Sequence, residues 1–197
     1  MRRLRPYGEL ERRAYHEAGH ALVALAEGFR VKRVTISRRG RLGGACESGL
    51  ALPSRASRRS LRRIVGATAA VALAGSAAQA REALARGSRS RAPASPPLFS
   101  AGSEDDEQIA TRFARRLHAG AAARRAYLRR VRAHVELVLA EPAAWAAVRR
   151  LARALLRART LTGAEASRMA RRAIADALRR APAVSGARRD ARGASRS

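Results

Sequence analysis

Two histidines four residues apart lie within a strongly helical pattern, and this combination constrains the fold more than any other feature of the sequence. The segment AYHEAGHALVAL occupies residues 14–25. Apolar residues recur at three- and four-residue steps from Leu10 to Leu25, and Gly28 can end the run, which predicts a helix over residues 8–28. Because positions four apart differ by about 40° around a helix axis, His16 and His20 are expected to point the same way.

The residues between the two histidines complete the pattern H-E-x-x-H. On a helix, this pattern can hold one zinc ion through both imidazoles, and the neighbouring glutamate, Glu17, can take the proton of a zinc-activated water. Gly19, inside the pattern, is expected to let another backbone approach closely. The competing interpretation is an ordinary alanine-rich helix whose two histidines are spaced by chance.

A hydrolytic zinc site usually has a third protein ligand. The remaining histidines, His118 and His134, lie in arginine-rich helical segments and are expected to be structural or solvated. The acidic cluster EDDE at residues 104–107 predicts charge compensation at a helix N-terminus, and one of its members could also be the third ligand. The residues alone leave this choice open.

The rest of the sequence predicts a mainly α domain with one small β element near the N-terminus. The alternating segment VKRVTIS, residues 31–37, indicates a strand, and glycine-rich residues 38–54 indicate a hairpin or an irregular loop. Further helices are expected at residues 57–86, with Ser57 or Ser60 as cap, from Ser103 to about His118, at 121–140, at 142–158, and after a capping box formed by Thr162 and Glu165. A Ser/Pro/Gly-rich loop is expected at residues 87–102.

The domain is expected to span residues 1–180, followed by a basic, disordered tail at 181–197. The longest uncharged apolar run, residues 64–78, is shorter than the roughly 20 residues of a membrane span. With no secretory signal visible either, we expect a cytoplasmic protein without a membrane span.

The formal net charge of +27 is almost entirely arginine, with Lys32 as the only lysine. This excess predicts non-specific attraction to polyanions, and it keeps a basic nucleic-acid-binding protein as an alternative. Aromatic residues, at 4%, are few for base stacking. The single cysteine, Cys46, excludes an intrachain disulfide and fits a reducing compartment, either as a small apolar filler or as a reactive or metal-blocking group.

Several motifs, in order, closely resemble the peptidase domain of FtsH-type AAA zinc metalloproteases. AYHEAGHA is followed by the strand VKRVTI, residues 31–36, and by RRGRLGG, residues 38–44. Further on, VALAGSAAQA (71–80), AGSEDDEQIATRFARRL (101–117) and RALLRARTLTGAEASRM (153–169) are similar to later motifs of that family. The family's R-A-A-E-E reads Ser76-Ala77-Ala78-Gln79-Ala80 here, and no G-x-x-x-x-G-K-[ST] motif of an ATPase is present.

The resemblance implies a helical zinc metallopeptidase domain that stands alone, without the ATPase module. Its third zinc ligand is an aspartate four residues before Ala-Thr, which falls on Asp106 because Ala110-Thr111 fixes the register. The implied site is therefore His16, His20 and Asp106 around Zn²⁺, with Glu17 as the catalytic base. The implied activity is endopeptidase cleavage of unfolded or flexible protein, with substrate received at the strand edge near residues 31–45.

The resemblance also leaves open a homo-oligomer and a separate AAA ATPase partner. A catalytically inactive zinc-binding regulatory or adaptor protein on the same fold remains the main alternative to the enzyme.

Overall fold

The computed structural model describes residues 8–37, 44–49, 57–87 and 101–181, and its described part is mainly helical with a small three-stranded antiparallel sheet. This confirms the predicted fold class. The helices are α1 (Glu9–Ala26), α2 (Arg58–Ala85), α3 (Ala101–Leu117), α4 (Ala121–Ala140), α5 (Pro142–Ala158) and α6 (Gly163–Arg180). The strands are β1 (Arg30–Thr35), β2 (Ala45–Gly49) and β3 (Thr160–Thr162). Residues 88–100 of the loop predicted at 87–102 lie outside the described residues, as do residues 182–197 of the predicted tail. The loop prediction is wrong for residues 101 and 102, which belong to α3.

The sheet has the strand order β2-β1-β3, so β1 is paired on both sides. β2 confirms the hairpin alternative for part of residues 38–54, while 38–43 and 50–54 lie outside the described part. β3 was not predicted, because a three-residue strand has no readable alternation. It is held by remote contacts, in which the Ile36 N–H donates to the Arg159 carbonyl at 2.9 Å.

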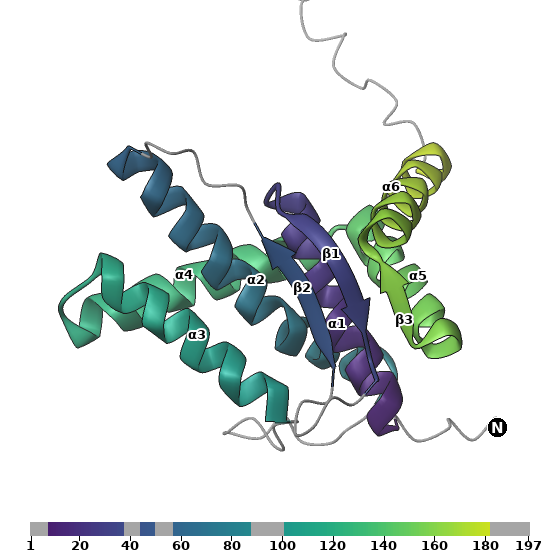
Figure 1. The fold of residues 1–197 in the computed structure, drawn as a ribbon, viewed down its shortest axis with the longest axis horizontal. Helices are drawn as coiled ribbons and strands as arrows, with labels where there is room; N and C mark the ends of the chain where they lie inside the picture. Colours follow the sequence, from purple (N-terminus) through teal and green to yellow (C-terminus); the bar gives the residue numbers. More distant parts are fainter. Residues whose placement is uncertain (1–7, 38–43, 50–56, 88–100, 182–197) are drawn as a thin grey trace, which may run out of the picture.

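Helix α1 is the centre of the fold. It packs against α2 and α5, and the sheet covers another of its faces. Helices α2, α3 and α4 lie toward the β2 edge of the sheet, and α5 and α6 lie toward the β3 edge (Figure 1). The contact with α2 is close because Gly19 has no side chain. A Cβ at Gly19 would lie 2.6 Å from the Ala74 carbonyl oxygen and 2.7 Å from the Ala78 Cβ. The prediction of a close backbone approach at Gly19 is confirmed.

Two predicted helix caps are confirmed and one is wrong. The Ser57 hydroxyl accepts from the Ser60 N–H at 3.2 Å, and Thr162 and Glu165 form a capping box. Helix α3, however, begins at Ala101, so Ser103 lies inside its first turn rather than at the cap. A serine is tolerated there because the first N–H groups of a helix have no intrahelical partners.

Helix α2 combines length with low polarity. Residues Arg59–Ala85 are long and apolar enough, by composition, to cross a membrane, and 44% of the most apolar window is buried inside the protein. The buried positions include Ala70, Leu73 and Ala74, which belong to the hydrophobic core. Packing against α1, α3 and α4 therefore accounts for the apolar face of this helix.

We predict that Gly163→Ala destabilises the protein, because an added Cβ would lie 1.8 Å from the Val31 carbonyl oxygen, a backbone atom that cannot turn away. The expected loss in free energy of unfolding is about 1–3 kcal/mol, measured by urea denaturation. Gly120→Ala is the matched control, because nothing lies within 4 Å of its added Cβ. Equal effects of the two substitutions would contradict the close contact between α6 and β1.

Candidate metal centre

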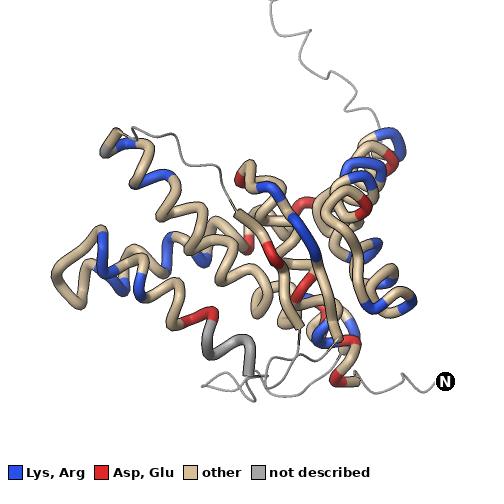
Figure 2. The backbone as a smooth tube through the Cα atoms, in the orientation of Figure 1, with Lys and Arg blue, Asp and Glu red and all other residues tan. Residues whose placement is uncertain are grey.

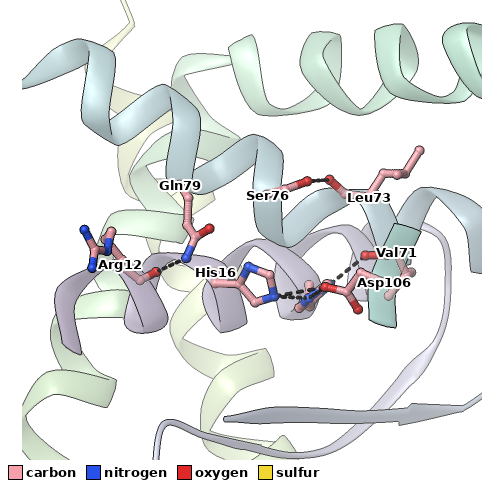
Figure 3. A network of polar contacts seen from close by, with 8 residues as sticks. Arg12, His16, Val71, Leu73, Ser76, Gln79 and Asp106 are labelled. Carbon is pink, nitrogen blue, oxygen red and sulfur yellow. Dashed lines mark hydrogen bonds and ion pairs between the residues drawn. The ribbon is translucent and has the colours of Figure 1, made fainter. Parts of the chain in front are cut away.

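Three side chains that could ligate a metal ion meet in the core between α1 and α3. His16 and His20 on α1 are only 4% and 7% exposed, and Asp106 reaches them from α3. The His16 Nε2, His20 Nε2 and Asp106 Oδ2 atoms lie 3.0 Å from one another in every pair. Figure 3 shows the carboxylate of Asp106 pointing toward the imidazole of His16. The structure thus brings together the three predicted ligand residues as a group that could hold a metal ion.

Helix α2 orients the second histidine. His20 Nδ1 lies 2.7 Å from the Val71 carbonyl oxygen, and since a carbonyl only accepts, Nδ1 carries the proton and donates. In the neutral ring this leaves the Nε2 lone pair free to face the other two donors. His16 Nδ1 is buried without a hydrogen-bond partner among the described residues.

Gly75 of α2 makes room for both imidazoles. A Cβ at this position would lie 2.5 Å from His20 Nε2 and 2.7 Å from His16 Nδ1. Any side chain at residue 75 would therefore push the two rings out of their present positions. The helix interior carries a glycine here, despite its cost of about 1 kcal/mol relative to alanine, because the rings occupy the space.

The charges of the cluster are strongly coupled. Burial opposes a charge on His20, but its hydrogen bond to Asp106 and the negative charges of Asp106 and Glu17 raise the pKa of His20 to about 9. Burial also opposes the Asp106 carboxylate, yet hydrogen bonds from His16 and His20 lower the pKa of Asp106 to about 2. Without a metal, a proton on His20 thus partly balances the buried carboxylate, and a metal cation would replace that proton.

Glu17 lies beside the three donors and is not one of them. Its side chain is buried, its Oε2 atom has no hydrogen-bond partner among the described residues, and burial raises the pKa of its carboxyl. The start of the hairpin's return strand lies against it, since a Cβ at Gly44 would be 2.6 Å from Glu17 Oε1. A buried carboxylate with spare acceptor capacity and a raised pKa is suited to accept a proton.

Two residues that replace charged positions of the resembled family turn to the backbone instead. The Ser76 hydroxyl donates to the Leu73 carbonyl at 3.2 Å, and the Gln79 amide donates to the Arg12 carbonyl at 3.1 Å (Figure 3). Both are neutral contacts within α2 or between α2 and α1. The orientation of the imidazoles therefore rests on Val71 and Gly75 rather than on charged side chains at residues 76 and 79.

The other candidate ligands lie elsewhere or lack the chemistry. His118 packs its ring against Tyr127, and His134 pairs with Glu27 at 2.9 Å, as expected for structural or solvated residues. In the acidic cluster, Glu107 pairs with Arg132 at 2.5 Å. Burial, reinforced by the charge of Glu17, raises the pKa of Cys46, which keeps its thiol neutral and favours the filler interpretation over a metal-blocking thiolate.

The sequence did not predict which parts of α2 orient and position the two imidazoles. The Val71 carbonyl is a backbone group, and its residue type carries no signal. Gly75 did carry a signal, because a glycine inside a long helical pattern indicates close packing. Which neighbour it packed against could not be predicted.

The chain was also compared with known proteins. No protein-family model matches it, and no curated protein matches it. The resemblance to the metallopeptidase domain therefore rests on the ordered sequence motifs alone.

We predict that Gly75→Ala weakens binding of added zinc at least about tenfold, because its Cβ displaces both imidazoles. Gly66→Ala is the matched control on the same helix, since its nearest neighbour, the Tyr127 hydroxyl, lies at an ordinary 3.4 Å. Competition with a chromophoric chelator measures the affinity. Unchanged zinc affinity in Gly75→Ala would contradict the placement of the rings against α2.

The metal-free protein is expected to be more stable at about pH 6 than at about pH 9.5. The pKa of His20 is raised from 6.5 to about 9 on folding, so its contribution is fully present below 6.5 and is lost as the pH rises through 9. The midpoint of thermal unfolding at the two pH values, in the presence of chelator, measures this. Asp106→Asn removes the charge that raises the pKa of His20, and it should reduce the difference; the same pH dependence in that variant would contradict the assignment.

Proposed function

We propose that this protein is a zinc-dependent endopeptidase. The observation that carries the proposal is the triangle of His16 Nε2, His20 Nε2 and Asp106 Oδ2. Beside it lies a carboxylate oxygen of Glu17 that has no hydrogen-bond partner among the described residues. Three protein ligands and an adjacent general base are the recurring parts of a hydrolytic zinc site.

The donor set supports zinc in particular. Tetrahedral zinc with bonds of about 2.0–2.1 Å requires donors roughly 3.3 Å apart, and the three donor pairs here are at 3.0 Å. Two imidazoles and one carboxylate also suit iron(II). The buried glutamate next to the first histidine favours hydrolysis over oxygen chemistry, because only hydrolysis requires a base at that place.

The residues of this chain divide the chemistry between them. A zinc ion held by His16, His20 and Asp106 would supply Lewis acidity, which acidifies a water molecule and polarises a peptide carbonyl. Glu17 accepts the proton of the attacking water and delivers it to the leaving amine. Its raised pKa makes it a stronger base for the first transfer and a competent acid for the second.

The substrate backbone is proposed to pair with β2. The substrate edge was expected near residues 31–45. Among the described strands, β1 is paired on both sides and cannot accept another strand, so we place the substrate at the unpaired edge of β2. Gly44, the residue before β2, lies against Glu17. An extended peptide added to this edge would run past the catalytic base, which favours unfolded or flexible segments as substrates.

Glu17→Gln is expected to lower the rate of cleavage of an unfolded protein, such as reduced, alkylated casein, at least about 100-fold while zinc binding is retained. The amide keeps the shape of the side chain and cannot accept the proton. Cleavage is followed by the release of new amino termini, and zinc by elemental analysis. Glu27→Gln is the matched control, because Glu27 follows the same helix and pairs with the remote His134.

Three outcomes are distinguishable. Zinc bound by both variants with cleavage lost only in Glu17→Gln supports the endopeptidase. Stoichiometric zinc without Glu17-dependent cleavage, even when an AAA unfoldase and a folded substrate are supplied, contradicts it and favours the regulatory or adaptor alternative. Absence of zinc binding would contradict both.

A further inference from the structure

A cavity separate from the candidate metal centre, with several basic residues in its lining, lies between α2 and α4. It has a volume of about 510 Å³ and extends to the end of α1 and the C-terminal end of α3. None of its lining residues belongs to the group of His16, His20 and Asp106 or is Glu17. The cavity is within the size range of small-molecule sites, which is about 300–1,000 Å³.

The rim of the cavity is strongly cationic. Arg62 and Arg63 come from the first turns of α2, and Arg130 comes from α4. Among the described residues, no acidic side chain forms an ion pair with any of these three arginines. The one acidic residue of the lining, Glu27, is engaged by His134 at 2.9 Å.

This local imbalance differs from the general basic character of the surface. Basic residues are spread over the helices on both sides of the sheet (Figure 2), and several are neutralised by acidic neighbours, as Arg150 and Arg179 are by Asp176. Around the cavity, exposed arginines from two helices border one open pocket instead. Guanidinium groups bind phosphate oxygens in pairs of parallel hydrogen bonds, and several of them around one cavity favour a multiply charged phosphate.

The floor of the cavity is apolar, which suits the uncharged part of a ligand. Ala67, Ala70 and Val131 are buried there, and the rings of Tyr127 and His118 lie 5.0 Å apart, centroid to centroid, at one side. A planar group could stack against these rings. A cationic rim over an apolar floor with aromatic rings at one side is suited to a nucleotide-like molecule.

We propose that this cavity binds a small phosphorylated molecule, with Arg62, Arg63 and Arg130 holding the phosphate groups. The proposal is independent of the peptidase chemistry, since the two sites share no residue. Part of the net charge of +27 would then serve a specific binding site, in addition to attracting polyanions non-specifically.

The test is isothermal titration of the full chain with inorganic pyrophosphate and with ADP, at about 0.15 M salt so that long-range attraction is screened. The wild type is expected to bind both saturably, one molecule per chain, and ADP more tightly because of the apolar floor. The variant Arg62→Gln/Arg63→Gln/Arg130→Gln is expected to weaken binding at least about tenfold, since it loses the charge-assisted hydrogen bonds to the phosphate groups.

The control variant is Arg149→Gln/Arg153→Gln/Arg157→Gln, which removes the same charge from the exposed positions of α5. It should change the affinity less than about twofold. An equal loss in both variants would overturn the proposal in favour of general attraction. Binding that survives in the Arg62/Arg63/Arg130 variant would also overturn it, because the phosphate would then be held at the metal centre or elsewhere. Binding of a single-stranded oligonucleotide without binding of either small phosphate would assign the patch to nucleic acid instead.

Circular dichroism and zinc content of both variants are compared with the wild type, so that a folding defect is recognised. If the cavity variant does not fold, Arg130→Gln alone, an exposed position on α4, is tested in its place. An unchanged affinity in that variant would overturn the role of Arg130.

Discussion

The close contact between α1 and α2 is the constraint on which the candidate site depends. Gly19 lets the backbone of α2 approach at Ala74, and Gly75 lets the two imidazoles of α1 fit against α2. At this separation the Val71 carbonyl reaches His20 Nδ1. The contact between α1 and α2 therefore fixes the positions of both rings, and it fixes the proton position and the direction of Nε2 in His20. Small residues in this helix interface help to orient the imidazoles, a role that charged neighbours often have around metal ligands.

The cluster is electrostatically incomplete without a cation. The two imidazoles and Glu17 are buried and Asp106 is partly buried, and burial opposes the charged form of each acid. A proton on His20 partly compensates, as the raised pKa of this residue shows. A divalent ion would satisfy the same groups more fully and would release that proton. Metal binding and protonation at His20 are thus expected to compete, which links metal affinity to pH.

Helical periodicity was enough to predict that His16, Glu17 and His20 share one helix and that the two imidazoles point the same way. Spacing could not predict Asp106, which is far away in the sequence; the residues left a choice within EDDE, and only the resemblance to a known domain selected one member. The strand β3 and the hydrogen bond to Val71 were not predicted, because a short strand and a backbone carbonyl depend on remote packing. Ser103 was misplaced because a serine is compatible with both a cap and a first turn.

X-ray absorption spectroscopy at the zinc edge of the zinc-loaded protein would test the ligand set of the proposed zinc site. We expect two imidazole ligands, recognised by their multiple scattering, and a first shell made only of nitrogen and oxygen at about 2.0–2.1 Å. Asp106→Ala should lower the metal content and change the oxygen contribution while both imidazoles remain. A first shell containing sulfur at about 2.3 Å would assign the metal to Cys46 and contradict the site. Fewer than two imidazoles would equally contradict the pairing of His16 and His20.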